Sequence, residues 1–420
     1  MKITFRKIDI WKYLFLYLIF QAPISNLIKN EFISNIFGYS DEAIGVILFI
    51  IVIFKAMKSE ITLLRFERYM LVFMFIFEII GIISGFKYKY QEIPYMFVDA
   101  YTCAKFFIYY LSARLLTQGK LSKDYFLSIN RICKIVAVIF FALSLHEVLF
   151  DQWWPNPDYR YFAYSVQLFF GHPEALARAC ITFIFVLAYN YRYCKHNIYY
   201  IIMLTAVMIF TFRTKAIIGV FTLYILYIYF VKLRFKSLIP IGAISIGGAC
   251  YLGYNSLYGY YIESEKSARK ILTLDSIEIA KGYFPLGSGF GSFASNISAQ
   301  YYSNLYIKLG YYSRNDLNIG EKNHSFLSDT FWPIVVAQTG WIGTIAFIMT
   351  LLSMILYIIQ TRKNDIYYFW VAISIIAYDI ISSFAAPAFF YPAAIAPFLF
   401  LGLITSINAF PKNNILTKRN

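Results

Sequence analysis

Apolar runs follow one another along almost the whole chain and are interrupted once, by a long polar stretch at residues 255–330. Charged residues make up only 15% of the sequence and aromatic residues 20%. A domain in water needs polar faces around its core, and this chain has too few polar residues to supply them. The chain therefore needs lipid as its solvent, and we expect an all-α integral membrane protein.

Apolar windows long enough to cross a bilayer predict about twelve transmembrane helices. They lie at Ile10–Ile28, Ala43–Met57, Tyr69–Gly85, Tyr95–Leu116, Ile132–Phe150, Ala175–Tyr191, Ile198–Phe212, Ala216–Val231, Ser237–Tyr254, Gly340–Ile359, Ile366–Phe384 and Phe389–Ala409. The first follows basic residues as a signal peptide would, but no A-x-A site follows it, so we interpret it as an uncleaved anchor. This divides the chain into helices 1–9 (residues 1–254), a large loop (255–330) and helices 10–12 (331–420).

Basic residues concentrate in alternate connections, which is typical of the cytoplasmic side of a membrane protein. They are Lys55, Lys58, Arg65 and Arg68; Lys120, Lys123 and Arg131; Arg192 and Lys195; Lys232, Arg234 and Lys236; Arg362 and Lys363; and Lys412, Lys418 and Arg419. Both termini are then predicted to be cytoplasmic and the large loop to lie outside, between spans 9 and 10. The net charge of +15 mostly reflects this bias, and we expect no nucleic-acid partner.

Several chemistries are not indicated by the sequence. It has no G-x-x-x-x-G-K-[ST] phosphate loop and no H-E-x-x-H zinc motif, and its four histidines lack ligand spacing, so we expect neither a metal nor a cofactor. None of the five cysteines lies in a predicted outer loop, so no disulfide framework is implied. The glycines of Gly287–Gly291 predict a tight turn, which could let the backbone approach a ligand.

Basic residues on the predicted outer side are more informative, because the positive-inside bias works against them. Arg213 and Lys215 lie in a tight turn between two spans, Arg160 lies in a shorter outer loop, and Arg269 begins an amphipathic stretch that ends at Lys281. These residues could snorkel at helix ends or belong to an interfacial helix. Taken together, they predict a site for a lipid-linked pyrophosphate, because guanidinium groups bind phosphate oxygens bidentately.

His324, near the end of the large loop, could accept a proton from a hydroxyl nucleophile. It could equally be a surface histidine, and Asp329 or Glu321 could orient it or replace it as the base. The loop's tyrosines could stack on sugars or form an aromatic belt. Charged residues also fall within predicted spans, at Glu78, Asp99, Lys105 and Asp379, where they are functional candidates or mark the ion path of a transporter.

The chain resembles the O-antigen polymerase and ligase family of bacterial envelope glycosyltransferases. Four motifs carry the resemblance: Arg160 with Gly171-His172-Pro-Glu-Ala175; Thr211-Phe-Arg-Thr-Lys-Ala216; Arg269 through Gly287-Ser-Gly289-Phe-Gly291; and Asn323-His-Ser-Phe-Leu327 with Gly340-Trp-Ile-Gly343. They cover roughly residues 155–345, together with the overall pattern of spans.

This resemblance implies a GT-C-like glycosyltransferase of the bacterial inner membrane that uses an undecaprenyl-pyrophosphate-linked glycan and needs no metal. In a polymerase the acceptor is the terminal sugar of a new lipid-linked repeat unit, and a chain-length regulator in the membrane is an implied partner. In a ligase the acceptor is lipid A–core. We expect a polymerase, with His324 as catalytic base; with Arg160, Arg213, Lys215 and Arg269 binding pyrophosphate; and with Gly171, His172, Gly289, Asn323 and Asp329 in support. The alternatives are the ligase and, from another class, a flippase for lipid-linked oligosaccharides.

Overall fold

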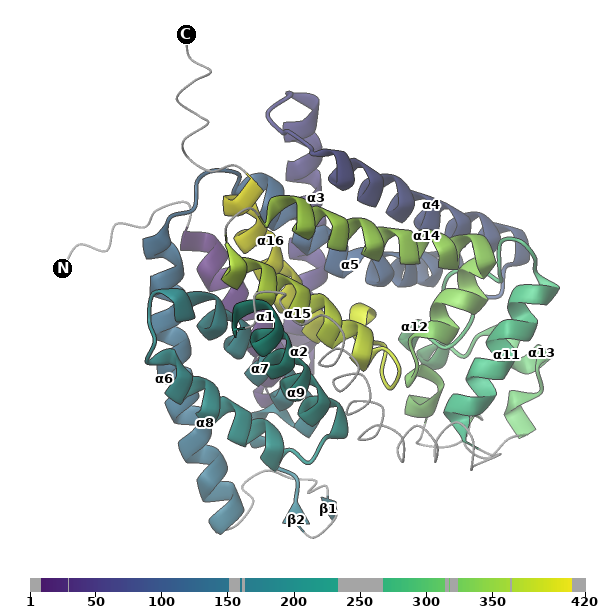
Figure 1. Cartoon of the computed structure of the whole chain (residues 1–420). Helices are drawn as coiled ribbons and strands as arrows, with labels where there is room; N and C mark the ends of the chain where they lie inside the picture. The colour runs from purple at the N-terminus through teal and green to yellow at the C-terminus, as the bar shows by residue number, and fades with distance from the viewer. Residues whose placement is uncertain are drawn as a thin grey trace.

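The computed structural model describes residues 9–28, 30–150, 159–160, 163–232, 267–313, 317, 324–362 and 365–409. The described residues are mainly helical, and the only strands among them are β1 (Tyr159–Arg160) and β2 (Ala163–Tyr164), which pair antiparallel. The α-helices are α1 (Ile10–Leu27), α2 (Glu31–Gly38), α3 (Ser40–Met57), α4 (Arg65–Tyr88), α5 (Ile93–Leu116), α6 (Lys123–Leu149), α7 (Pro173–Tyr189), α8 (Asn197–Phe210), α9 (Thr214–Tyr227), α11 (Ala268–Gly282), α12 (Asn296–Gln300), α13 (Asn304–Lys308), α14 (Trp332–Thr361), α15 (Ile366–Ser382) and α16 (Ile395–Ala409) (Figure 1).

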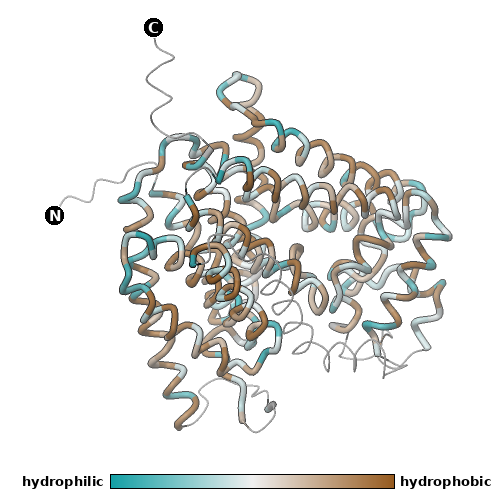
Figure 2. The backbone as a smooth tube through the Cα atoms, viewed as in Figure 1, coloured by the Kyte–Doolittle hydropathy of each residue, from teal (hydrophilic) through white to brown (hydrophobic). Residues whose placement is uncertain are grey.

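Long apolar helices confirm the expectation of an all-α membrane protein. Five helical segments of the described residues are long and apolar enough to cross a bilayer: Phe32–Met57, Arg65–Tyr88, Lys123–Leu149, Thr214–Lys232 and Trp332–Thr361. Apolar residues run along most of the tube in Figure 2. Other predicted spans are shorter helices or, like α5, carry several charged residues, so length and composition alone do not establish twelve spans. The span predicted at 237–254 lies outside the described residues.

The helix connections gather at two ends of the bundle. At one end, the Lys12 ammonium group donates to Ser128, Thr117 on α5 contacts Ser406 on α16, and Arg192 pairs with Asp365. We call this the termini end, because α1 begins and α16 finishes there. The connection between α3 and α4 is at the top of Figure 1, and β1 and β2 are at the bottom. We call the end with β1 and β2 the loop end. The sequence predicted that the N-terminal end of α1, where Lys12 lies, and the connection that contains Arg192 are on the same side of the membrane.

The described part of the large loop folds as a helical unit against the bundle. The amphipathic stretch predicted from Arg269 to Lys281 is confirmed as helix α11, and its residues Leu272 and Ile279 are buried. α11 packs against α14, so its apolar face contacts protein.

The tight turn predicted at Gly287–Gly291 is present and lies between α4 and α14. We call this turn the glycine wedge. The amide of Ser288 donates to the Ala337 carbonyl at 2.8 Å, and the amide of Gly289 donates to the Gln338 carbonyl at 2.8 Å. A Cβ added at Gly289 would lie 2.3 Å from the backbone nitrogen of Gly85, and the φ angle of Gly289 is +94°. The glycines therefore let the turn approach the helices closely, and it is these helices that the backbone contacts rather than a ligand.

Candidate functional site

Charged side chains from several elements meet at the loop end of the bundle. Lys215, in the first turn of α9, places Nζ 2.8 Å from Oε2 of Glu174, in the first turn of α7. The same ammonium group donates to the carbonyl of Ala385 at 3.1 Å. The tight turn that the sequence predicted around Arg213 and Lys215 lies between α8 and α9, and its Lys215 side chain contacts the beginning of α7.

A second ion pair lies one turn further along α7. Nη1 of Arg178 is 3.1 Å from Oδ1 of Asp379 on α15, and Nε of Arg178 is 3.7 Å from Oε1 of Glu174. Arg178 is only 2% exposed and Asp379 is 0% exposed. The guanidinium also lies 5.8 Å and 5.7 Å from the ring centroids of Tyr378 and Tyr391. A buried charge of this kind is stable only when it is paired, so Asp379 and Arg178 depend on each other.

The large loop contributes a third pair. Arg269 on α11 donates from Nε to Oδ2 of Asp329 at 2.8 Å, and its Nη2 contacts the same oxygen. Burial raises the pKa of the Asp329 carboxyl above its usual value, although Arg269 and, more weakly, Lys215 act in the opposite direction. Lys215, and Glu174 in the opposite sense, act on the Asp329 carboxyl at a distance, so the Arg269–Asp329 pair lies within electrostatic range of the Lys215–Glu174 pair.

His172 connects Arg213 to this cluster. Its Nδ1 accepts a hydrogen bond from the amide of Glu174 at 3.2 Å and so caps α7, while Nη2 of Arg213 lies 3.4 Å from its Nε2. A neutral imidazole accepts at one nitrogen only, so the ring can accept from only one of these two donors at a time. Gly171 precedes it with a φ angle of +70°, a left-handed conformation that favours glycine at this turn into α7.

The structure thus brings together five of the site residues predicted from sequence, and places the others as follows. Those brought together are Arg213, Lys215, Arg269, His172 and Asp329, with Gly171 beside them. Gly289 lies instead in the wedge against α4. Arg160 is in β1 and His324 begins the short helix His324–Ser328, but their side chains, like the whole of Asn323, lie outside the described residues.

The predicted site omitted three residues of the cluster: Glu174, Arg178 and Asp379. The sequence singled out Asp379 only as one of the charged residues within a span. The signal that could have joined them was their position, because opposite charges at a similar depth in a membrane protein tend to pair. Sequence alone does not show that α7 and α15 are neighbours.

Two of the remaining charges within predicted spans, Lys105 and Asp99, contribute to helix packing. Lys105 pairs with Asp41 on α3 at 2.7 Å and also contacts Glu42. Asp99 accepts a hydrogen bond from the amide of Gly291 at 2.7 Å and so holds the glycine wedge. Asp99 and Lys105 therefore bind different partners.

The tyrosines of the large loop differ in their roles. Tyr306 and Tyr311 are fully buried and stack on each other, with ring centroids 5.3 Å apart, so they form the core of the loop. Tyr301 stacks on Tyr95 with centroids 3.6 Å apart. Tyr312, 60% exposed, remains open to contact with a ligand or with lipid headgroups.

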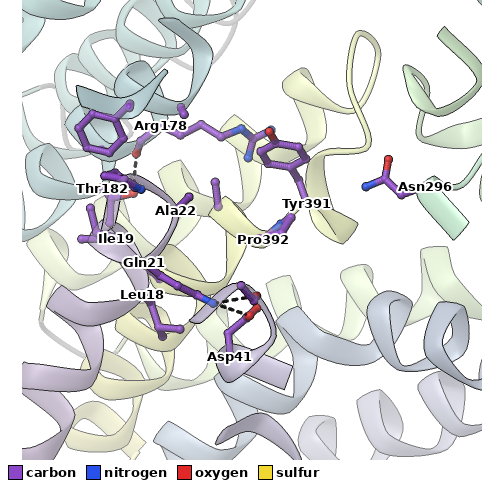
Figure 3. Close-up of a pocket in the computed structure, with 17 residues that line it drawn as sticks. Leu18, Ile19, Gln21, Ala22, Asp41, Arg178, Thr182, Asn296, Tyr391 and Pro392 are labelled. Atoms are coloured by element: carbon purple, nitrogen blue, oxygen red, sulfur yellow. Dashed lines mark hydrogen bonds between the residues drawn. The ribbon is translucent and has the colours of Figure 1, made fainter. Parts of the chain in front are cut away.

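A cavity of about 340 Å³ adjoins the cluster, and Arg178 belongs to both (Figure 3). Its wall includes residues of α1, α7 and α12 and the segment around Tyr391. No group of three or more His, Cys, Asp or Glu side chains that could hold a metal ion occurs in the part of the chain that the structure describes. Compared with known proteins, the chain matches no family model and no curated protein.

Proposed function

We propose that the protein is a polymerase of O-antigen or a related surface polysaccharide. It transfers a growing glycan from undecaprenyl pyrophosphate onto the terminal sugar of a new lipid-linked repeat unit, on the outer face of the bacterial inner membrane. The observation that carries this proposal is the cluster itself, which unites the basic turn before α9, the beginning of α7 and the start of the large loop.

The charge balance of the cluster suits a polyanion. The cations are Arg178, Arg213, Lys215 and Arg269, and the carboxylates are Glu174, Asp329 and Asp379. The cations are one more in number, and the carboxylates keep them in place before a ligand arrives. A pyrophosphate that enters can share these cations and adds the negative charge that the cluster lacks. Preorganised donors of this kind stabilise a leaving group without further reorganisation.

In the proposed transfer, the hydroxyl oxygen of the acceptor sugar attacks the anomeric carbon of the donor glycan. The bond between that carbon and the phosphate oxygen breaks, and the electron pair leaves with the lipid-linked pyrophosphate, which the cationic side chains hold. The hydroxyl proton goes to a base, which we assign to His324. Asp329 is the alternative base, since its raised pKa brings the carboxyl closer to neutral pH, where a base works best.

Deletion of the gene separates the polymerase from the other candidates. Loss of a polymerase leaves lipopolysaccharide core with a single repeat unit on a gel. Loss of a ligase leaves bare core with polymer on the carrier, and loss of a flippase leaves bare core with single units on the inner face.

Complementation of the deletion strain then tests the cluster. Arg213→Ala and Arg269→Ala are each expected to lower polymerisation about 10²- to 10³-fold, the usual cost of losing one preorganised donor. Lys281→Ala is the matched control, because this lysine is on the same helix as Arg269 but, among the described residues, pairs with the exposed Glu278 alone. Normal ladders from both arginine variants, with the proteins inserted in the membrane, would disprove the assignment. Unchanged chain length in His324→Ala would move the role of base to Asp329 or Glu321.

A further inference from the structure

The cavity beside the cluster has unused hydrogen-bonding groups on its wall. Nη1 of Arg178 binds Asp379 and Nε lies 3.7 Å from Glu174, whereas Nη2 has no hydrogen-bond acceptor among the described residues. Figure 3 shows the Arg178 side chain extending toward Tyr391, with Asn296 on the far side of the space. The Asn296 amide also makes no side-chain hydrogen bond within the described part of the chain, and Tyr391 is 36% exposed.

The opposite side of the cavity carries a carboxylate, and both of its oxygens already accept hydrogen bonds. Gln21 on α1 donates to Oδ1 of Asp41 at 2.7 Å, and Oδ2 of Asp41 accepts from Lys105 at 2.7 Å. Most of the remaining wall is apolar, with Leu18, Phe170 and Ala179 among its residues. The cavity is therefore a small apolar space with polar groups at several points around it.

The charges of this wall cancel. Arg178 is balanced by Asp379, and Asp41 is balanced by Lys105, which Glu42 also contacts, so no cation is left in excess. An anion placed here would gain little from Coulombic attraction, whereas the cluster outside the cavity offers an excess of cations. A neutral ligand with many hydroxyl groups can instead accept hydrogen bonds from Nη2 of Arg178 and from the Asn296 amide. The apolar faces of such a ligand can lie against the aliphatic residues and Tyr391.

The size of the cavity favours the same ligand. Its volume, about 340 Å³, is at the lower end of the roughly 300–1,000 Å³ that is typical of small-molecule sites. This suits a monosaccharide or a disaccharide better than a long polyprenyl chain. We propose that the cavity is a saccharide subsite, which binds a neutral sugar residue of the lipid-linked substrate next to its pyrophosphate. That the sugar belongs to a substrate rests on the proposed function, whereas sugar binding itself does not.

The test uses the full-length protein in lipid nanodiscs and saturation-transfer NMR. The probes are the methyl glycosides of glucose, galactose, mannose, rhamnose, N-acetylglucosamine and N-acetylgalactosamine, and inorganic phosphate is the competitor. Asn296→Leu removes a polar group from an exposed position, and Ala179→Phe fills the cavity. Ala56→Phe, at an exposed position of α3 far from the cavity wall, is the matched control.

We expect at least one glycoside to bind to the wild type and to Ala56→Phe, without displacement by phosphate. Binding should weaken about five-fold in Asn296→Leu, as for the loss of one hydrogen bond, and vanish in Ala179→Phe. The proposal is overturned if no glycoside binds, if phosphate displaces it, or if Asn296→Leu binds as the wild type does. Should Ala179→Phe not fold, Asn296→Leu alone decides.

The two proposals fail in different ways. If the polymerase assignment is wrong, deletion of the gene leaves a normal ladder while glycosides still bind in the cavity. If the saccharide subsite is wrong, Arg269→Ala still lowers polymerisation while glycoside binding does not depend on Asn296.

Discussion

Two buried arginines, Arg114 near the termini end and Arg178 near the loop end, have different surroundings. Arg114 on α5 is 0% exposed, and its Nε and Nη2 lie 2.9 Å and 3.0 Å from the carboxylate oxygens of Glu67 on α4. Its Nε also donates to the hydroxyl of Tyr357 on α14 at 2.6 Å. Arg178 pairs with Asp379, its Nη2 has no hydrogen-bond acceptor among the described residues, and the side chain lines a cavity.

The comparison shows that a buried ion pair is not by itself evidence of a functional site. Arg114 on α5 contacts side chains of α4 and α14, and Glu67 also accepts a hydrogen bond from the Leu64 amide at the beginning of α4. This pair therefore holds the three helices together. Arg178 forms a similar pair, but further cations and a cavity adjoin it. The functional assignment therefore depends on these neighbours.

The largest expected effect is on stability at the termini end. Arg114→Met leaves the Glu67 carboxyl buried without its partner, and loss of one member of such a pair typically costs about 3–5 kcal/mol. Thermal unfolding of the purified protein in detergent measures the loss. Arg65→Met, which removes an exposed cation in the first turn of the same α4, should unfold as the wild type does.

Matched double variants sharpen the comparison, because they remove both charges of a pair and leave no lone buried ion. Arg114→Met/Glu67→Gln and Arg178→Met/Asp379→Asn should both recover most of the stability lost by the single arginine variants. Only the second is expected to lower polymerisation, by about 10²- to 10³-fold, on lipopolysaccharide gels. An equal loss of polymer in both would show that the two arginines do not differ in function.

A smaller effect is expected from the wedge between α4 and α14. Gly289→Ala places a Cβ against the backbone of Gly85 and keeps a left-handed φ angle, so we expect a loss of about 1–3 kcal/mol in thermal unfolding. Gly310→Ala has a similar φ angle of +70° but open space around it, and it should lose less. Equal losses would show that strain alone, and not the close approach, accounts for the effect.

The smallest effect concerns Asp329 and pH. Its pKa is raised in the folded protein, so the protonated form is favoured by folding, and this contribution to stability is lost as pH rises through the raised pKa. Asp329→Asn, which cannot ionise, should therefore be slightly more stable than the wild type at neutral pH and equal to it in acid. A larger advantage in acid than at neutral pH would contradict the shift. Because Asp329→Asn leaves the Arg178–Asp379 pair intact, the change in stability with pH can be assigned to Asp329.

The lengths of the apolar runs predicted the helices well. A backbone surrounded by lipid must form its hydrogen bonds within its own segment, and a helix does this. The run at Ile132–Phe150, for example, corresponds to α6. The positive charge and the predicted outer position of Arg213, Lys215 and Arg269 also marked them as site residues, and they do share a cluster. The pairing of Arg178 with Asp379 was not predictable, since it depends on which helices are neighbours. Nor was the packing role of Gly289, since a glycine turn looks the same whether it approaches a ligand or a helix.

The glycine wedge also determines whether the polar stretch can be expressed or exchanged apart from the rest of the protein. The amides of Ser288 and Gly289 are bound to α14, Gly291 is bound to Asp99, and Gln338 donates to the carbonyl of Phe293 at 2.7 Å. Residues 267–313 excised for expression in water would lose all of these partners and expose the apolar face of α11. A chimaera that exchanges this stretch with that of another protein would need to bring α4 and α14 along with it.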